Sequence, residues 1–168
     1  GVPLSGEASL QRDGPADAAR LQASLTAGGN RIDLRADAAA AAGRSAALPA
    51  ADRWSATVQA PDLATLAPLR PLLAELLPAS AEAIAAAWPG AGRLQATAQA
   101  QGRWPALQSE GSLQATALAT PTAQLQQATL RWRQGARSDA PLQIDLAARD
   151  LRSGTQRVDV LSLAVTGT

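Results

Sequence analysis

The sequence predicts a mainly β protein: an antiparallel meander of strands with a short helical insertion at about residues 62–88. The first observation is strict alternation, in which apolar residues at 94, 96, 98 and 100 are separated by glutamine or threonine. A strand sends successive side chains to opposite faces, so such a strand has one apolar and one polar face. The second observation is that leucine recurs every three to four residues between 63 and 77, which is the period of an amphipathic helix.

The composition fits one domain and excludes several functional classes. The chain has 168 residues, and we expect residues 1–168 to form a single β-rich, repeat-like segment of a longer chain. The net charge is +1 and basic residues are interspersed with acidic ones, so no nucleic-acid partner is expected. There is no cysteine for disulfides or thiolate metal sites.

The first third of the chain contains four predicted strands or strand-like stretches. Residues 4–12 form a strand that ends at Asp13-Gly14-Pro15. Residues 21–27 and 32–38 form a hairpin around Gly28-Gly29-Asn30, because a tight turn requires residues that tolerate positive φ. Residues 38–51 are rich in alanine and predict only a weak strand or loop, and residues 54–60 form the next strand, closed by Pro61.

The helical insertion is expected to consist of short pieces. Asp62 is placed to cap the first turn, and Pro68 and Pro71 favour two short helices because proline removes a donor within a helix. Ser80 then caps a further helix over residues 81–88, which stops at Pro89-Gly90. We expect the insertion to lie against one end or the open side of the sheet.

Alternation resumes after the insertion and continues to the last residues. It is seen over residues 94–101, 113–117, 128–132 and 142–148. In the last strand Val158 and Val160 share one face, whereas Leu161, Leu163 and Val165 share the other. This change of phase at 160–161 predicts a β-bulge or a bend.

The side-chain chemistry argues against catalysis. The chain has no histidine, so imidazole bases and imidazole metal ligands are absent, and we expect neither an enzyme nor a bound metal or cofactor. Carboxylates are the remaining candidates, at Asp33, Asp37, Asp145 and Asp159, but solvated charges on polar faces are the favoured interpretation. Gly90-Ala91-Gly92 lacks the third glycine of a dinucleotide-binding fingerprint.

The apolar faces are lined mainly by alanine, with leucine at intervals. Facing sheets with ordinary side chains lie about 10 Å apart, so alanine-lined sheets either approach more closely or leave space for a guest. Trp132 either lines a groove or fills a core, and Trp104 is expected to pack at a corner. The periodicity does not distinguish a core that is filled by protein side chains from a space that is open to a guest molecule.

Several motifs resemble one known family. They are Ala60-Pro61-Asp62-Leu63 followed by Pro68-Leu69, the pattern Gly102-Arg103-Trp104-Pro105-Ala106-Leu107 followed by Gly111-Ser112-Leu113, and the turn Gly28-Gly29-Asn30. Together they resemble the TamB proteins of the AsmA-like superfamily, although Pro105 follows Trp104 directly rather than a few residues later.

The resemblance implies a periplasmic β-sheet curled into a U-shaped, β-taco-like trough with an apolar interior. Such proteins are anchored in the inner membrane of Gram-negative bacteria. They are implicated in moving phospholipids to the outer membrane, and in outer-membrane protein assembly with a BamA-like partner. Under this reading, twelve residues line the groove and contact phospholipid acyl chains: Leu94, Ala96, Ala98, Ala100, Leu113, Ala115, Ala117, Leu130, Trp132, Leu142, Ile144 and Leu146.

The alternative is a purely structural segment, a closed β-sandwich or a β-solenoid, with no ligand. The two readings differ in whether the apolar faces are covered by protein. No transmembrane segment is expected within this chain, since its longest uncharged stretch, residues 111–130, is rich in glutamine and threonine.

Overall fold

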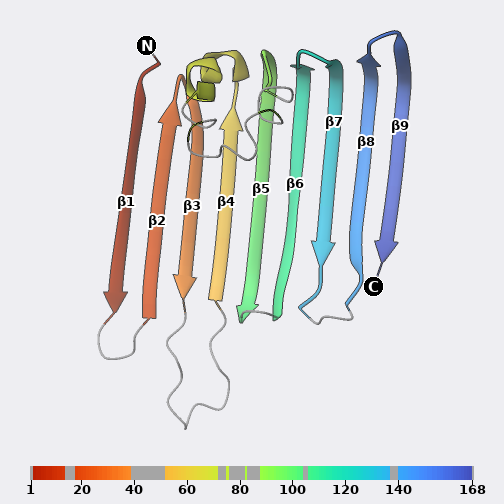
Figure 1. Ribbon diagram of the computed structural model, residues 1–168. Coiled ribbons are helices and arrows are strands. Elements are labelled where there is room, and N and C mark those ends of the chain that lie inside the picture. The colour runs from red at the N-terminus through yellow and green to blue at the C-terminus, as the bar shows by residue number, and fades with distance from the viewer. Residues whose placement is uncertain are drawn as a thin grey trace.

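The computed structural model describes residues 2–13, 18–38, 52–71, 75, 82, 88–103, 106–136 and 140–167. These residues form one nine-stranded antiparallel sheet in which each strand pairs with its neighbours in the sequence (Figure 1). The strands are β1 (Leu4–Asp13), β2 (Ala18–Ala27), β3 (Asn30–Ala38), β4 (Asp52–Ala60), β5 (Ala91–Arg103), β6 (Ala106–Ala119), β7 (Ala123–Gln134), β8 (Leu142–Ser153) and β9 (Gln156–Gly167). The predicted antiparallel meander is therefore confirmed.

The hairpin between β2 and β3 forms where the sequence predicts it. Ala27 pairs with Asn30, and Gly28 and Gly29 make the turn with φ angles of 56° and 84°. Positive φ at both central positions matches the twist of the flanking strands and favours glycine. The weak strand or loop predicted at residues 38–51 lies outside the described residues, except for Ala38, which ends β3.

The register aligns apolar residues into rows that cross the sheet. Directly paired residues of antiparallel strands share a face. Row 1 consists of Gly6, Leu25, Ile32, Val58, Ala96, Leu113, Leu130, Leu146 and Leu163. Row 2 consists of Ala8, Ala23, Leu34, Ala56, Ala98, Gly111, Trp132, Ile144 and Val165. Both rows run through all nine strands without a polar residue.

The insertion between β4 and β5 begins as predicted. The 3₁₀ helix η2 (Leu63–Leu69) follows Asp62, whose carboxylate accepts a hydrogen bond from the Ala64 N–H at 3.0 Å. Pro68 lies inside η2, and α-helical backbone follows at Arg70 and Pro71. The helix type therefore changes between Pro68 and Pro71, in line with two short helical pieces, and residues 72–74 lie outside the described residues. In so short a 3₁₀ segment the proline removes one donor without breaking a long hydrogen-bond ladder.

The helix predicted over residues 81–88 falls mostly outside the described residues. Of these residues, Glu82 is helical and Trp88 is not.

A hydrogen-bond cluster joins the insertion to the β2–β3 turn. The Asn30 side-chain amide donates to the carbonyl oxygens of Ala27 (3.0 Å) and Asp62 (2.9 Å) and to Thr65 Oγ1 (2.7 Å), and its oxygen accepts from the Asp62 N–H. Thr65 Oγ1 also lies 3.0 Å from the Gly28 carbonyl oxygen. Asn30 is the one asparagine of the chain, and its buried amide fixes the insertion at this end of the sheet.

In the last strand the ladder is interrupted at Asp159, between the pairs made by Val158 and Val160, and not at the predicted position 160–161. This interruption is part of a wider feature. One row of cross-strand partners consists of Leu118, Leu125, Leu151 and Val158. Each of them lies three residues along its own strand from the nearest residue of the next apolar row. Between those positions, Ala117 in β6 and Asp150 in β8 have φ angles of 51° and 50°. Since regular alternation needs an even spacing, these left-handed residues shift the phase of β6–β9 along one line.

The sheet is open. Its first and last strands, β1 and β9, pair on one side only, and the described residues contain no second sheet facing the apolar rows. This arrangement is consistent with the predicted trough.

Candidate apolar binding face

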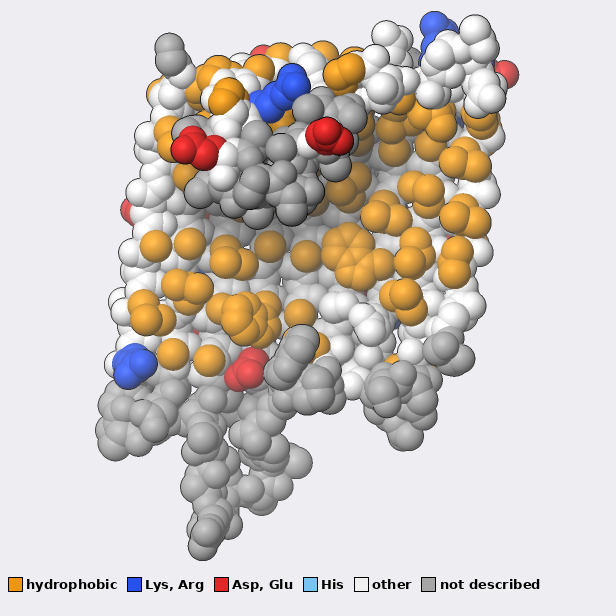
Figure 2. Space-filling model, viewed as in Figure 1, with side chains coloured by type: hydrophobic (Ala, Val, Ile, Leu, Met, Phe, Trp, Pro, Cys, Tyr) orange, Lys and Arg blue, Asp and Glu red, His pale blue; other side chains and the backbone are white. Residues whose placement is uncertain are grey.

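One face of the sheet presents hydrophobic side chains across its whole width. Figure 2 shows them from one edge of the sheet to the other. Large hydrophobic residues on it remain exposed, among them Leu25, Ile32, Leu163 and Val165. A soluble single-layer sheet rarely exposes so continuous an apolar surface unless it binds something.

Eleven of the twelve predicted lining residues lie on this face. Leu94 and Ala115 are paired with each other, Ala100 pairs with Trp54 of β4, Leu142 pairs with Gln134 of β7, and the others belong to rows 1 and 2. Ala115 is buried, with 3% of its surface exposed, and the remaining ten are partly exposed. The alternation in the sequence therefore identified a real common surface.

Ala117 departs from this pattern. It has a left-handed backbone, forms no ladder pair between Thr116 and Leu118, and is exposed. The apolar position near this site is instead Leu118, which pairs with Leu125.

The sequence-based selection missed both ends of the rows. Leu161, Leu163 and Val165 of β9 continue the face beyond β8, and Leu25 and Ile32 continue it toward β1. The signal was present, because these residues alternate as regularly as those of β5.

Trp132 packs across the neighbouring strand. A Cβ built at Gly111 would overlap the six-membered ring of the Trp132 indole and lie 2.6 Å from the Thr97 carbonyl oxygen. The indole therefore covers Gly111, where no other residue would fit, and it remains partly exposed. Trp104, the other tryptophan assigned a role from the sequence, lies outside the described residues.

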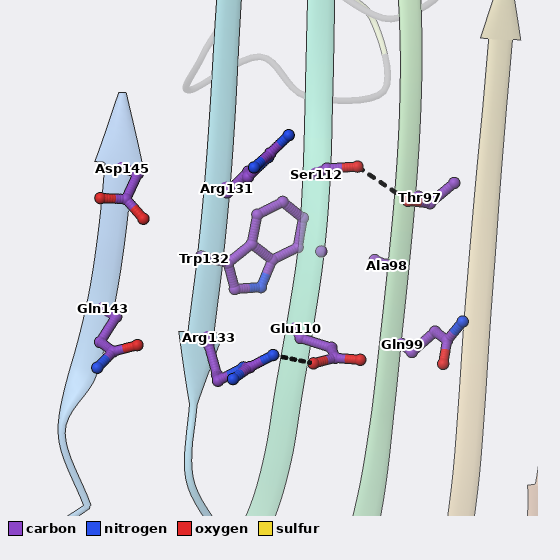
Figure 3. A pocket seen from close by; sticks show the side chains of 11 residues that line it. Thr97, Ala98, Gln99, Glu110, Ser112, Arg131, Trp132, Arg133, Gln143 and Asp145 are labelled. Atoms are coloured by element: carbon purple, nitrogen blue, oxygen red, sulfur yellow. Dashed lines mark hydrogen bonds and ion pairs between the residues drawn. The ribbon is translucent and has the colours of Figure 1, made fainter. Parts of the chain in front are cut away.

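The opposite face is polar and carries shallow hollows. The one shown in Figure 3 has a volume of about 420 Å³ and lies among side chains of β5–β8. Thr97 and Ser112 hydroxyl groups lie 3.1 Å apart there, and Arg133 Nη2 lies 3.4 Å from Glu110 Oε2 (Figure 3). Most of its lining residues carry amide, hydroxyl or charged side chains, and Ala98, Gly111 and Trp132 of row 2 complete the lining.

Of the four carboxylates considered for catalysis, Asp145 lines the hollow of Figure 3 and the other three form ion pairs. Arg20 contacts Asp37 at 2.8 Å, and Arg157 contacts Asp159 at 2.7 Å. Arg31 contacts Asp33 at 2.7 Å, and its hydrogen bond holds the pKa of that carboxyl below the usual range. In the parts of the chain that the structure describes, no three acidic residues gather to form a metal site.

Comparison with protein-family models, curated proteins and solved structures finds no match for this chain. Among the described residues, no helix is both long and apolar enough to cross a membrane.

Proposed function

We propose that this chain is a segment of a hydrophobic groove that carries phospholipid acyl chains between the inner and outer membranes of a Gram-negative envelope. The observation that carries the proposal is the pair of unbroken apolar rows across nine strands, with no second sheet over them among the described residues. An acyl chain has no polar groups to satisfy, so a ligand of this kind needs only an apolar surface.

The direction of the rows suits lateral movement of lipid. Neighbouring strands lie about 4.8 Å apart, so eight intervals give rows of about 38 Å running across the strands. Each methylene group that leaves water on this surface contributes about 0.8 kcal/mol, and it does so equally at each strand. Such a surface holds an acyl chain firmly while leaving it free to move from strand to strand.

The cellular setting of the proposal rests on the resemblance to TamB proteins. It places the chain in the periplasm, as part of an inner-membrane-anchored protein, with a BamA-like outer-membrane partner for the full-length protein and a role in envelope assembly. Hydrogen bonds from the Asn30 amide to Asp62 and Thr65 join the two motifs at residues 28–30 and 60–65.

Titration with a fluorescent fatty acid tests the proposal. We expect saturable uptake by the 168-residue chain, and at least a tenfold loss of affinity in Ala98→Arg, which places a charge in row 2. The matched control is Gln99→Arg, whose side chain is on the polar face of the same strand, and this variant should bind like the parent. Absence of uptake, or equal effects of the two variants, would favour a purely structural segment without a ligand.

The site of the substitution is important for this test. Ala98 is partly exposed, whereas Ala115 is 3% exposed. Ala115→Arg would place a charge where it cannot be solvated, and we expect it to reduce stability by several kcal/mol. Loss of lipid binding in Ala115→Arg is therefore uninformative, and Ala98→Arg is the variant to use.

A further inference from the structure

One pair of like charges meets across neighbouring strands of the sheet. Arg152 of β8 and Arg157 of β9 are direct cross-strand partners. Like charges placed directly opposite each other destabilise a sheet. The other directly paired charges among the described residues are opposite in sign: Arg20 with Asp37, Asp37 with Arg53, Glu110 with Arg133 and Arg131 with Asp145. The pair of Arg152 and Arg157 therefore departs from the rule that the rest of the sheet follows.

The nearby carboxylates pair with only one of the two arginines. Arg157 Nη2 donates to Asp150 Oδ1 at 2.8 Å, and Arg157 Nε donates to Asp159 Oδ1 at 2.7 Å. Among the described residues, no carboxylate forms an ion pair with Arg152. Arg152 is exposed, and a guanidinium group has five N–H donors in a planar fork. Its donors are therefore available to a further anion.

The two arginines border a hollow on the polar face of the sheet. It has a volume of about 550 Å³ and extends from β6 to β9, where small alanine side chains of β6 leave space. Gln124 and Gln126 of β7 add amide groups to its lining, and Asp150 lines it with a carboxylate that Arg157 already contacts. A phosphate group carries negative charge and several acceptor oxygens, and planar guanidinium groups bind it well. The hollow therefore offers charge and donors that suit a phosphate group.

The hollow lies next to the end of the apolar face. One row of cross-strand partners consists of Ala119, Gln124, Arg152 and Arg157, each at most one residue from the end of its strand. The adjacent residue in each strand belongs to the apolar row that contains Leu118 and Val158. Adjacent residues in a strand are about 3.3 Å apart and point to opposite faces. A phospholipid on the apolar face can therefore bend its headgroup over this end of the sheet toward the arginines.

We propose that Arg152 and Arg157 bind a phosphate group in this hollow, and that it is the headgroup phosphate of a phospholipid whose acyl chains lie on the apolar face. The first part stands on the arginine pair, and the second part rests on the proposed function. A bound phosphate places negative charge between two positive groups, which removes the repulsion within the pair. It also orients the lipid, with its headgroup at the end of the sheet that carries the β6–β7 and β8–β9 turns.

Two short-chain lipids separate the contribution of the phosphate from that of the acyl chains. Dioctanoyl phosphatidylglycerol and dioctanoylglycerol have the same acyl chains, and only the first has a phosphate. In isothermal titration calorimetry the 168-residue chain should bind the phospholipid about tenfold more tightly, as charge-assisted hydrogen bonds allow. Arg152→Gln should remove this preference and keep the affinity for dioctanoylglycerol. Arg93→Gln changes an exposed arginine of β5 that pairs with Thr116, and it should keep both affinities. Equal affinities of the parent for the two lipids, or equal effects of the two variants, would overturn the phosphate site and leave the apolar groove standing.

Glycerol 3-phosphate identifies the source of the phosphate. It has the phosphate without acyl chains, so it should bind more weakly than the phospholipid and lose binding in Arg152→Gln. If it binds as tightly as the phospholipid while dioctanoylglycerol does not bind, the site takes a soluble phosphate, and both the lipid assignment and the proposed function are overturned. If neither the phospholipid nor glycerol 3-phosphate binds, the phosphate site itself is overturned.

Thermal unfolding without ligand shows whether Arg152→Gln is a sound variant. Because the substitution removes a pair of like charges, the variant should unfold at the same temperature as the parent or higher at low salt. Its loss of phosphate binding then does not come from loss of the fold. A lower unfolding temperature for Arg152→Gln would contradict repulsion between Arg152 and Arg157, which is the observation behind the site.

Discussion

The two halves of the sheet differ in whether a hydrogen-bonded cluster attaches another element to them. In β1–β5 the insertion is attached at one end through Asn30, whose amide makes hydrogen bonds to the turn and to η2. In β6–β9 no comparable cluster is present among the described residues, and the strands change phase along the line of Ala117 and Asp150. One half therefore attaches η2 at its end through the Asn30 hydrogen bonds, and the other has no such attachment among the described residues. Large hydrophobic side chains are exposed in both halves, at Leu25 and Ile32 as well as in β9.

The comparison separates a polar attachment at one end of the sheet from an apolar face with exposed side chains in both halves. The polar groups that attach η2 to the sheet are hydrogen-bonded, as buried polar groups usually are. A large exposed apolar face usually marks a binding surface, and the proposed function assigns it an apolar ligand. The following substitutions separate the two halves, beginning with the largest expected effect.

Asn30→Ala should weaken the N-terminal half and spare the other. It leaves the Asp62 N–H and three acceptors without their partner in a partly buried site, so we expect a loss of about 2 kcal/mol in the free energy of unfolding in urea. Hydrogen exchange should increase in β2–β4 and η2 but not in β7–β9. Gln95→Ala, which removes an exposed amide from the polar face, is the control and should change stability little. A loss below 0.5 kcal/mol for Asn30→Ala, taken as on the order of measurement error, would contradict the anchoring role.

Gly111→Ala should disturb the junction between the halves. The new methyl group overlaps the Trp132 ring and crowds the Thr97 carbonyl, so we expect a cost of about 2 kcal/mol. Adding Trp132→Leu should recover part of that cost and reveal coupling between the two positions in a double-mutant cycle.

Gly6→Ala in β1 is the matched control for Gly111→Ala. The nearest atoms there are Leu25 Cδ1 at 3.2 Å and the Ser24 carbonyl oxygen at 3.3 Å, neither of which overlaps the new methyl group, so the effect should be smaller than at Gly111. Equal costs for Gly6→Ala and Gly111→Ala would mean that the indole does not confer the specific requirement for glycine in β6.

Asp33→Asn should have the smallest effect, confined to acid. The pKa of Asp33 is lowered by its hydrogen bond from Arg31, so the stabilisation is complete above the ordinary carboxyl pKa of about 3.9 and is lost as pH falls through the lowered value. Thermal unfolding between pH 2 and pH 7 should therefore show a slightly flatter acid limb for the variant. Because both side chains are exposed, 1 M salt should remove most of the difference between the two proteins. An unchanged acid limb would show that the pair adds nothing to folding.

Much of the fold follows from local patterns. Strict alternation in β5 and the Gly28-Gly29 turn identified strands and a hairpin, because both depend on residues close in the sequence. The phase shift was expected only in β9, although Ala115 to Leu118 and Ala148 to Leu151 have the same odd spacing. Alanine at position 117 hid the shift in β6, since it fits either face of a strand.

The candidate site was less accessible to sequence reasoning. The alternating pattern assigns a face to each residue but does not give the register, and the register is what joins Leu113, Leu130 and Leu146 into one row. The role of Asn30 depends on contacts 32 and 35 residues away in the sequence, which no local pattern contains.

The most direct test of the uncovered face is to map where a lipid binds. The chain is incubated with vesicles that contain a phospholipid with a photoreactive diazirine in one acyl chain, irradiated, digested and analysed by mass spectrometry. We expect adducts on apolar-face residues of β5–β9, centred on Leu113, Leu130 and Leu146, and their loss in Ala98→Arg but not in Gln99→Arg. Adducts confined to the polar face, or none at all, would contradict the proposal that the apolar rows form a lipid-binding groove.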